Sequence, residues 1–227
     1  MNSIIKLPET LKETLVESDL SSIVIDVAEI TIDQFLSNGI IKEIPIINTL
    51  VSIVKGTQSV SNYLFLKKMV SFLNEVKDIP IEKRRCVIQK IEESKKYRNK
   101  VGEQLLFILD HCEDNIKAEN IAYWFKAFIN QQINYSEFLQ GASAINKITT
   151  EDFNAYITEN VEYFYDNSIY IGAGLTFMSM EDVSVENIES GDWDENPKLQ
   201  VFGGELEIEI TNIGHKIREI FKKKQSK

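Results

Sequence analysis

The chain has 227 residues, a mass of 26.1 kDa and a formal net charge of −10. This length suits one large domain or two small ones. Hydrophobic residues make up 43% of the chain and charged residues 26%, a composition typical of soluble globular domains. Two cysteines, Cys86 and Cys112, argue against a disulfide framework or a zinc site. Residues 1–11 lack the basic start and apolar run of a secretory signal, so we expect a reduced, cytoplasmic setting.

Charge is unevenly distributed along the chain. Residues 1–148 hold 18 basic and 19 acidic side chains, a net charge of −1, whereas residues 149–227 hold 7 and 16, a net charge of −9. Two surfaces of opposite charge can attract each other between copies of a protein, although solvated faces that never meet are the simpler interpretation. The charge pattern therefore makes self-association a hypothesis to carry forward.

The first helix is predicted over residues 8–38. It starts with Pro8, Glu9 and Thr10, which are typical of a first helical turn, and it ends at the C-cap signal Asn38-Gly39. Leucine, isoleucine and valine recur at helical spacing between these ends. We therefore expect one long amphipathic helix at the N-terminus.

An apolar run of eleven residues, 44–54, is bordered by charged residues and predicts a helix that begins near Pro45. It is well below the roughly 20 residues of a transmembrane helix, so a single-span membrane protein is excluded. We expect its apolar side to be core, and the alternatives are an oligomer or partner interface and shallow membrane insertion. The candidate face consists of Ile44, Ile47, Leu50, Val51 and Val54.

Further helices are predicted up to residue 148, separated by short polar turns. Their expected ranges are 60–78, 80–93, 97–112, 116–131 and 135–147. The first of them places Leu64, Met69, Phe72 and Val76 on its buried side. The central core is expected to contain Leu105, Leu109, Ile121, Trp124, Phe125 and Phe128. Residues 1–148 are therefore predicted to form a multi-helix bundle.

A basic stretch lies within this bundle. Residues 83–100 hold eight basic and two acidic side chains, which makes a nucleic-acid-binding surface an alternative hypothesis. The candidate basic surface consists of Lys83, Arg84, Arg85, Lys95, Lys96 and Arg98. We regard nucleic acid as the less favoured partner.

Residues 149–227 have a different pattern. After a helix from residue 150, extended segments are predicted over 168–180 and 198–210, and a helix follows from 211. Between the extended segments, an acidic loop is predicted over 181–197. Glu205, Glu207 and Glu209 alternate with apolar residues, which indicates a half-buried strand with an acidic outer face. These three glutamates form a candidate surface for a partner protein.

The sequence EIEITNIGHKIREIF, residues 207–221, resembles the end of winged-helix domains, in which a wing strand runs into T-x-x-G and a final helix. The resemblance covers about the last 90 residues and implies an α+β fold with a two-stranded β-hairpin. Winged-helix proteins usually read DNA with the helix before the wing. In this chain that helix spans about 150–160 and carries Glu151, Asp152 and Glu159 but no lysine or arginine. We therefore expect the wing to contact protein.

Residues 109–147 resemble a passage of small uncharacterised bacterial helical proteins, which offer no activity to carry over. The YSEFL sequence at 135–139 is reminiscent of an EF-hand helix, but the calcium loop is missing. His111 and Cys112 are adjacent on a helix and point about 100° apart, so they do not form a nucleophile and base pair. We predict no catalytic residues, no metal ligands and no cofactor.

The predicted fold class is mainly α, with a helical domain over 1–148 and a winged-helix-like domain over 149–227. The leading functional hypothesis is a non-enzymatic regulatory protein of bacterial or phage origin, in a phage-conflict or stress system. It would act by binding another protein or copies of itself. The alternatives are a membrane-associated effector that inserts the 44–54 helix and a nucleic-acid-binding regulator that uses the 83–100 surface.

Overall fold

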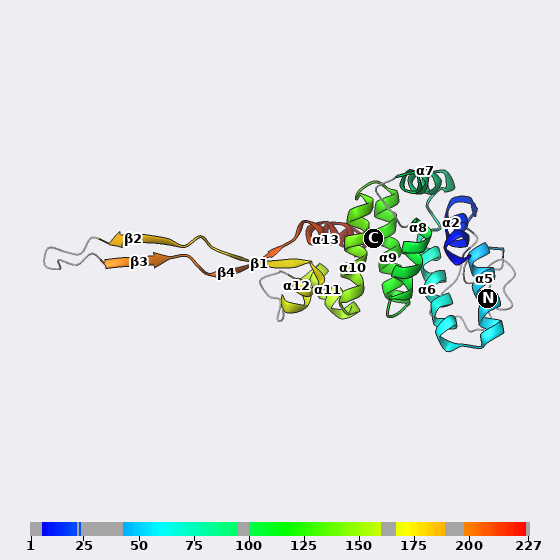
Figure 1. The fold of residues 1–227 in the computed structure, drawn as a ribbon, viewed down its shortest axis with the longest axis horizontal. Coiled ribbons are helices and arrows are strands. Elements are labelled where there is room, and N and C mark those ends of the chain that lie inside the picture. The colour runs from blue at the N-terminus through cyan, green and yellow to red at the C-terminus, as the bar shows by residue number, and fades with distance from the viewer. Residues whose placement is uncertain are drawn as a thin grey trace. The chain divides into compact units, whose positions relative to one another are not determined.

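The computed structural model describes residues 6–21, 23, 43–94, 100–159, 167–188 and 198–225. These residues form α-helices and one antiparallel hairpin, so the fold is mainly α, as predicted (Figure 1). The chain divides into two compact units between Glu151 and Asp152, and each unit is described by itself.

Unit 1 is a helical bundle. Pro45 lies at the start of its second described helix, and Asn134 and Glu137 form a capping box at the start of the last one. Its helices are α2 (Leu7–Glu17), α5 (Pro45–Thr57), α6 (Val60–Val76), α7 (Ile81–Glu92), α8 (Val101–Asp110), α9 (Asn115–Ile129) and α10 (Tyr135–Lys147).

The core of unit 1 lies where α6 and α10 pack against α9. Phe125 of α9 is central to it, with ring centroids 5.5 Å from Phe72 and 5.4 Å from Phe138. The indole Nε1 of Trp124 donates to the carbonyl of Phe138 at 3.1 Å, so this buried polar group is satisfied. All six residues predicted for the central core are buried.

Two predictions about the helices of unit 1 are wrong. The first helix ends at Glu17 and not near residue 38, because Ser18 is extended and the Asp19 side chain accepts a hydrogen bond from the Ser21 amide at 2.9 Å. Residues 24–42 lie outside the described residues. Leu64 is exposed, because the buried side of α6 is formed by Leu66, Met69 and their helical neighbours.

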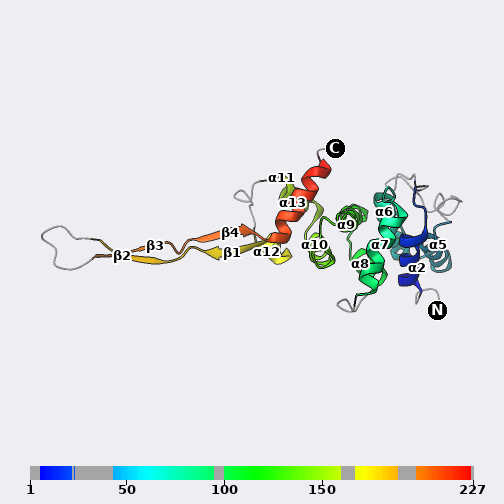
Figure 2. The ribbon, with the colours of Figure 1, turned by 90° about the horizontal axis from the view of Figure 1, so that it is seen from above.

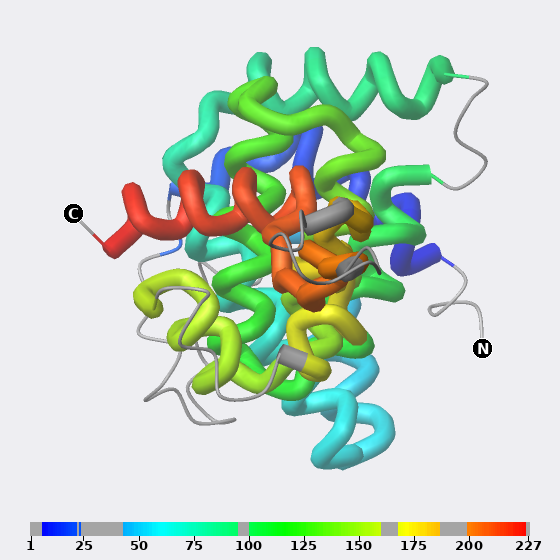
Figure 3. The backbone as a smooth tube through the Cα atoms, turned by 90° about the vertical axis from the view of Figure 1, so that its left-hand side faces the viewer, coloured from blue at the N-terminus to red at the C-terminus, as the bar shows by residue number. Residues whose placement is uncertain are grey.

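Unit 2 combines helices with the hairpin. Its elements are α11 (Thr150–Thr158), α12 (Asn167–Ala173), β1 (Thr176–Met180), β2 (Ser184–Ile188), β3 (Lys198–Phe202), β4 (Leu206–Ile210) and α13 (Asn212–Gln225). The helices pack through aromatic contacts, among them a perpendicular contact of Phe153 with Phe221 at 4.8 Å. Seen end-on in Figure 3, the paired strands lie side by side and α13 extends from their base.

The hairpin is longer than the sequence predicts. β1 pairs with β4 and β2 pairs with β3, in one register that runs from Thr176 opposite Ile210 to Ile188 opposite Lys198. The segment 181–197 was predicted as a loop, but Ser184–Ile188 is a strand, because valine at 183 and 185 alternates with polar residues. Conversely, residues 168–180 were predicted to be extended, but the first part of this segment belongs to the helix α12. A short apolar run does not distinguish a helix from a strand.

Candidate interaction surface

The apolar face of α5 is buried within unit 1. Ile44, Ile47, Leu50, Val51 and Val54 are each 5% exposed or less, because α5 packs against α2 and α6. The amide of Ile46 also donates to the buried Thr14 hydroxyl oxygen, which ties α5 to α2. This face therefore belongs to the core of unit 1, as we expected. The two alternatives, a partner interface and a lipid-binding face, are corrected.

The candidate basic surface is divided by the structure. Lys83 and Arg85 are exposed on α7, but Arg84 is 1% exposed and its guanidinium points into the bundle. Arg84 donates to the carbonyls of Ile79, Leu15 and Ser18 at 2.9–3.1 Å. Burial lowers the pKa of this guanidinium. Lys95, Lys96 and Arg98 lie outside the described residues.

Arg84 therefore has a structural role, which corrects its assignment to a nucleic-acid surface. The last turn of α2 leaves carbonyl groups without partners in the helix, and Arg84 satisfies those of Leu15 and Ser18. Arg85 adds a hydrogen bond from its Nε to the carbonyl of Val16 at 3.0 Å. A positive group at a helix C-terminus is also favoured by the helix dipole.

Among the described residues of unit 2, the hairpin exposes the most large apolar side chains, and we call residues 176–188 and 198–210 the arm. It has two different faces at its base, because successive residues of a strand point to opposite sides. Cross-strand pairs define an apolar face, which consists of Met178 with Ile208 and Met180 with Leu206. The opposite face carries Phe177 paired with Glu209, and Ser179 paired with Glu207.

Glu205, Glu207 and Glu209, which we call the acid row, lie on the second face, and all three are exposed. The structure thus brings these predicted residues together on one side of the arm. Their side chains are about 7 Å apart from one to the next along the strand. None of them forms an ion pair with another residue in the part of the chain that the structure describes.

The sequence predicts that Leu206, Ile208 and Ile210 form the buried side of a half-buried strand, but Leu206 is exposed, and the exposed apolar residues elsewhere on the arm were missed. Met180 is 63% exposed and Leu206 is 69% exposed, although both lie directly opposite each other. The outer part of the arm exposes a second group of large apolar side chains, which are Val183, Val185, Leu199, Val201 and Phe202. The alternation of Val183 and Val185 with polar residues was the signal that could have revealed the outer strand.

The base of the arm is held by the residues of the T-x-x-G sequence. The Thr211 hydroxyl donates to the Gly174 carbonyl at 2.9 Å and accepts from the Gly214 amide at 3.1 Å, so it caps α13 while binding the start of β1. Gly214 lies so close to Leu175 and Tyr156 that a Cβ would overlap both. Burial raises the pKa of Tyr156, whose hydroxyl donates to the Leu175 carbonyl at 3.3 Å.

Two glycines join the inner and outer parts of the arm. Gly203 and Gly204 have φ of 81° and 82°, a conformation that other residues rarely adopt. Glu181 spans this junction: its amide donates to the Glu205 carbonyl at 3.0 Å, and its carbonyl accepts from the Gly204 amide at 3.2 Å. The ladder therefore continues in the same register on both sides of the glycines.

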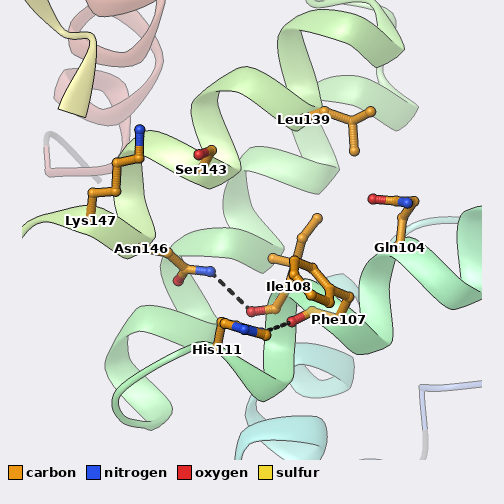
Figure 4. Close-up of a pocket in the computed structure, with 8 residues that line it drawn as sticks. All are labelled: Gln104, Phe107, Ile108, His111, Leu139, Ser143, Asn146 and Lys147. Carbon is orange, nitrogen blue, oxygen red and sulfur yellow. Dashed lines mark hydrogen bonds between the residues drawn. The ribbon is translucent and has the colours of Figure 1, made fainter. Parts of the chain in front are cut away.

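Unit 1 contains one further candidate, a pocket of about 380 Å³ between α8 and α10 (Figure 4). Phe107, which is 62% exposed, and His111 stack at its rim with centroids 4.2 Å apart. His111 Nδ1 lies 2.8 Å from the Phe107 carbonyl, and Asn146 donates to the Ile108 carbonyl at 3.0 Å. The residues that line the pocket include no carboxylate, so His111 has no acidic partner there.

Cys112 does not form a reactive pair with His111. Its thiol is buried, and two acceptors lie within reach of its single hydrogen: the Ile108 carbonyl oxygen at 3.4 Å and the Asn146 side-chain oxygen at 3.3 Å. Burial raises the pKa of this thiol to about 12, so it stays protonated at neutral pH. A nucleophilic role for this cysteine is therefore not supported by the geometry.

The described part of the chain contains no group of three or more His, Cys, Asp or Glu side chains that is arranged to hold a metal ion. Within the same residues, every helix is too short or too polar to cross a membrane. Comparison of the chain with protein-family models, with curated proteins and with solved structures gives no match.

Proposed function

We propose that the chain is a non-enzymatic protein-interaction protein and that the arm is its contact element. The observation that carries this proposal is the exposure of large apolar side chains on both the inner and the outer described parts of the arm. Clusters of this kind on a folded protein mark contact sites for other molecules. The wing-like position of the arm, before a final helix, agrees with the expectation that it contacts protein.

The energetics favour a covered arm. A two-stranded hairpin is marginally stable in water, and covering Met178, Met180 and Leu206 would contribute about 3–5 kcal/mol of hydrophobic free energy. Methionine adapts well to different surfaces because its side chain is flexible and polarisable. A partner that packs on this face would therefore stabilise both the contact and the hairpin.

The two alternative functions have less support. The membrane-effector hypothesis needs the α5 face, which is buried in unit 1. The nucleic-acid hypothesis loses Arg84, which is hydrogen-bonded to backbone carbonyls inside the bundle. The arm itself is acidic along its inner part and would repel a phosphate backbone.

A site-specific photo-crosslinker tests the proposal. We would place it at Met180 on the arm and, as a control, at the exposed Glu103 on α8, and irradiate native extracts. The account predicts a discrete protein adduct at position 180 that is absent at position 103. The adduct should also disappear when Leu206 is changed to Lys in the same chain. An arm that gives no adduct, or the same adducts as position 103, would contradict the proposed function.

A further inference from the structure

The segment from Glu205 to Gln225 carries opposite charges at its two ends. The acid row is at its beginning, whereas α13 holds five basic residues and one acidic residue, Glu219. We propose that the partner of the arm is a second copy of this chain, with the acid row of each copy bound to Lys222 and Lys223 of the other. This inference rests on the proposed function and names its partner, and the lysine contacts it adds lie on the face of the arm opposite Met178 and Met180.

The acid row is built to receive cations. Its three carboxylates lie along one side of the strand, and Phe177 lies on the same face, directly opposite Glu209. An aromatic ring beside carboxylates attracts a lysine through its π face, while the carboxylates accept hydrogen bonds from the ammonium group. The face is therefore more selective for a basic surface than an isolated carboxylate would be.

The end of α13 has the matching charge. Lys222 and Lys223 are exposed in the last turns of the helix. Lys223 is paired with Glu219 at 2.8 Å, and both side chains of this pair are more than 60% exposed. Exposed pairs of this kind are weak, so a row of three carboxylates can compete with Glu219 for the lysine.

The lysines of one copy are poorly placed to neutralise their own acid row. Figure 2 shows α13 running away from the arm, and ten residues of helix separate Asn212 from Lys222, a rise of about 15 Å. The Debye length is about 8 Å at physiological ionic strength, so attraction over this distance is screened. Opposite charges on a second copy can approach to contact distance.

Two-fold symmetry would satisfy both copies at once. When two segments that are negative at one end and positive at the other align antiparallel, each acid row meets the lysines of the other copy. The assembly then closes as a dimer with two identical contacts and does not extend into a fibre. Because the contacts are exposed, the affinity depends strongly on salt.

Charge reversal provides the test. One variant carries Glu205→Lys, Glu207→Lys and Glu209→Lys, and a second variant carries Lys222→Glu and Lys223→Glu. The mass of each full-length protein, and of an equimolar mixture, is measured by light scattering at about 50 mM and about 500 mM salt. A control with Glu13→Lys, Glu17→Lys and Glu103→Lys makes the same charge change at exposed sites on α2 and α8.

We expect the wild type and the control to dimerise at low salt, and the dimer to weaken at least tenfold at high salt. Each reversed variant alone should be monomeric, and the mixture should recover a dimer with one copy of each. Circular dichroism confirms that each variant is folded, and Glu→Gln versions of the acid row provide a milder change. A wild type that is monomeric at both salts, or a mixture of folded variants that stays monomeric, would overturn the inference.

The crosslinking experiment separates failure of this inference from failure of the proposed function. If the arm adduct at position 180 contains a different protein, the arm remains a contact element and only the second-copy inference is wrong. If no adduct forms and the wild type is monomeric, both are wrong.

Discussion

Gly214 in the first turn of α13 lies directly against the carbonyl oxygen of Leu175, and no side chain fits between them. A Cβ at this position would also overlap the Tyr156 hydroxyl and the Ile210 side chain, so three segments of unit 2 lie close to Gly214. Thr211, three residues earlier, caps α13 and holds the Gly174 carbonyl at 2.9 Å. This close approach holds the first turn of α13 against the residue that precedes β1.

Changing Gly214 to Ala should destabilise unit 2, because a Cβ would push α13 away from the start of β1. Forced overpacking of this kind costs about 1–3 kcal/mol. Urea denaturation followed through the tyrosines of unit 2 would measure the change in the free energy of unfolding. The exposed Gly172, where a Cβ meets no atom within 4 Å, provides a matched Gly→Ala control. An equal loss in the free energy of unfolding for Gly214→Ala and Gly172→Ala would contradict the close packing at Gly214.

Arg84→Met should lower the stability of unit 1 by about 2–4 kcal/mol, because it leaves the buried Leu15 carbonyl without its donor and removes three charged hydrogen bonds. Arg84→Lys should recover only part of the loss, since one ammonium group cannot reproduce the planar fork. Arg85→Met is the control: its side chain is exposed, and we expect a change within about 0.5 kcal/mol. Thermal unfolding measures the stability of each variant. An unchanged unfolding midpoint for Arg84→Met would contradict the structural role of Arg84.

The two cysteines should react differently with an alkylating reagent at pH 8. Cys86 is exposed and should be modified quickly, whereas Cys112 is buried with its pKa raised to about 12 and should react only when the protein unfolds. Mass spectrometry after a timed reaction distinguishes the two sites. Rapid modification of Cys112 in the folded protein would show that the packing of α8 against α10 is wrong.

The same thiol predicts a pH dependence of stability. Above its ordinary pKa of 9.0 the unfolded chain loses the Cys112 proton, while the folded chain keeps it up to about pH 12. The unfolded state is therefore favoured as pH rises through this window, by about 1.4 kcal/mol per pH unit for this group. Urea unfolding at pH 8 and pH 10 should show this extra loss in the wild type, and Cys112→Ala should remove it. An equal pH dependence in both proteins would contradict the assignment.

Gly203→Ala should disrupt the outer part of the arm and leave the helices intact. The substitution places a Cβ against the Asp182 carbonyl at a residue with φ of 81°. Amide resonances of β2 and β3 should lose their strand-like dispersion, while those of α9 stay unchanged. Unperturbed strand signals in the variant would argue against the glycine junction.

The helices of unit 1 could be predicted because their signals are local. Pro45 starts α5, and the capping box of Asn134 and Glu137 starts α10. The apolar period placed Trp124 and Phe125 in the core, where the structure has them. Each of these features depends on residues within a few positions along the chain.

Long-range features could not be predicted in the same way. Arg84 was assigned to the surface because its charge is local, whereas its burial depends on carbonyls of α2 that lie 66–69 positions away in the sequence. The strand Ser184–Ile188 lies in the segment predicted as a loop, because the acidic and glycine residues around it conceal the valine alternation. The pairing of Met180 with Leu206 likewise depends on a register that only the folded chain defines.

Amide hydrogen exchange of the wild-type protein as a function of its own concentration tests whether copies of the chain meet through the arm. An uncovered two-stranded hairpin exchanges quickly, and a second copy bound to it slows that exchange. Protection of the amides at residues 176–180 and 206–210 should rise with protein concentration at low salt, while protection of the α9 amides should stay constant. Exchange of the arm that is equally fast at every concentration would contradict the claim that copies of this chain meet through it.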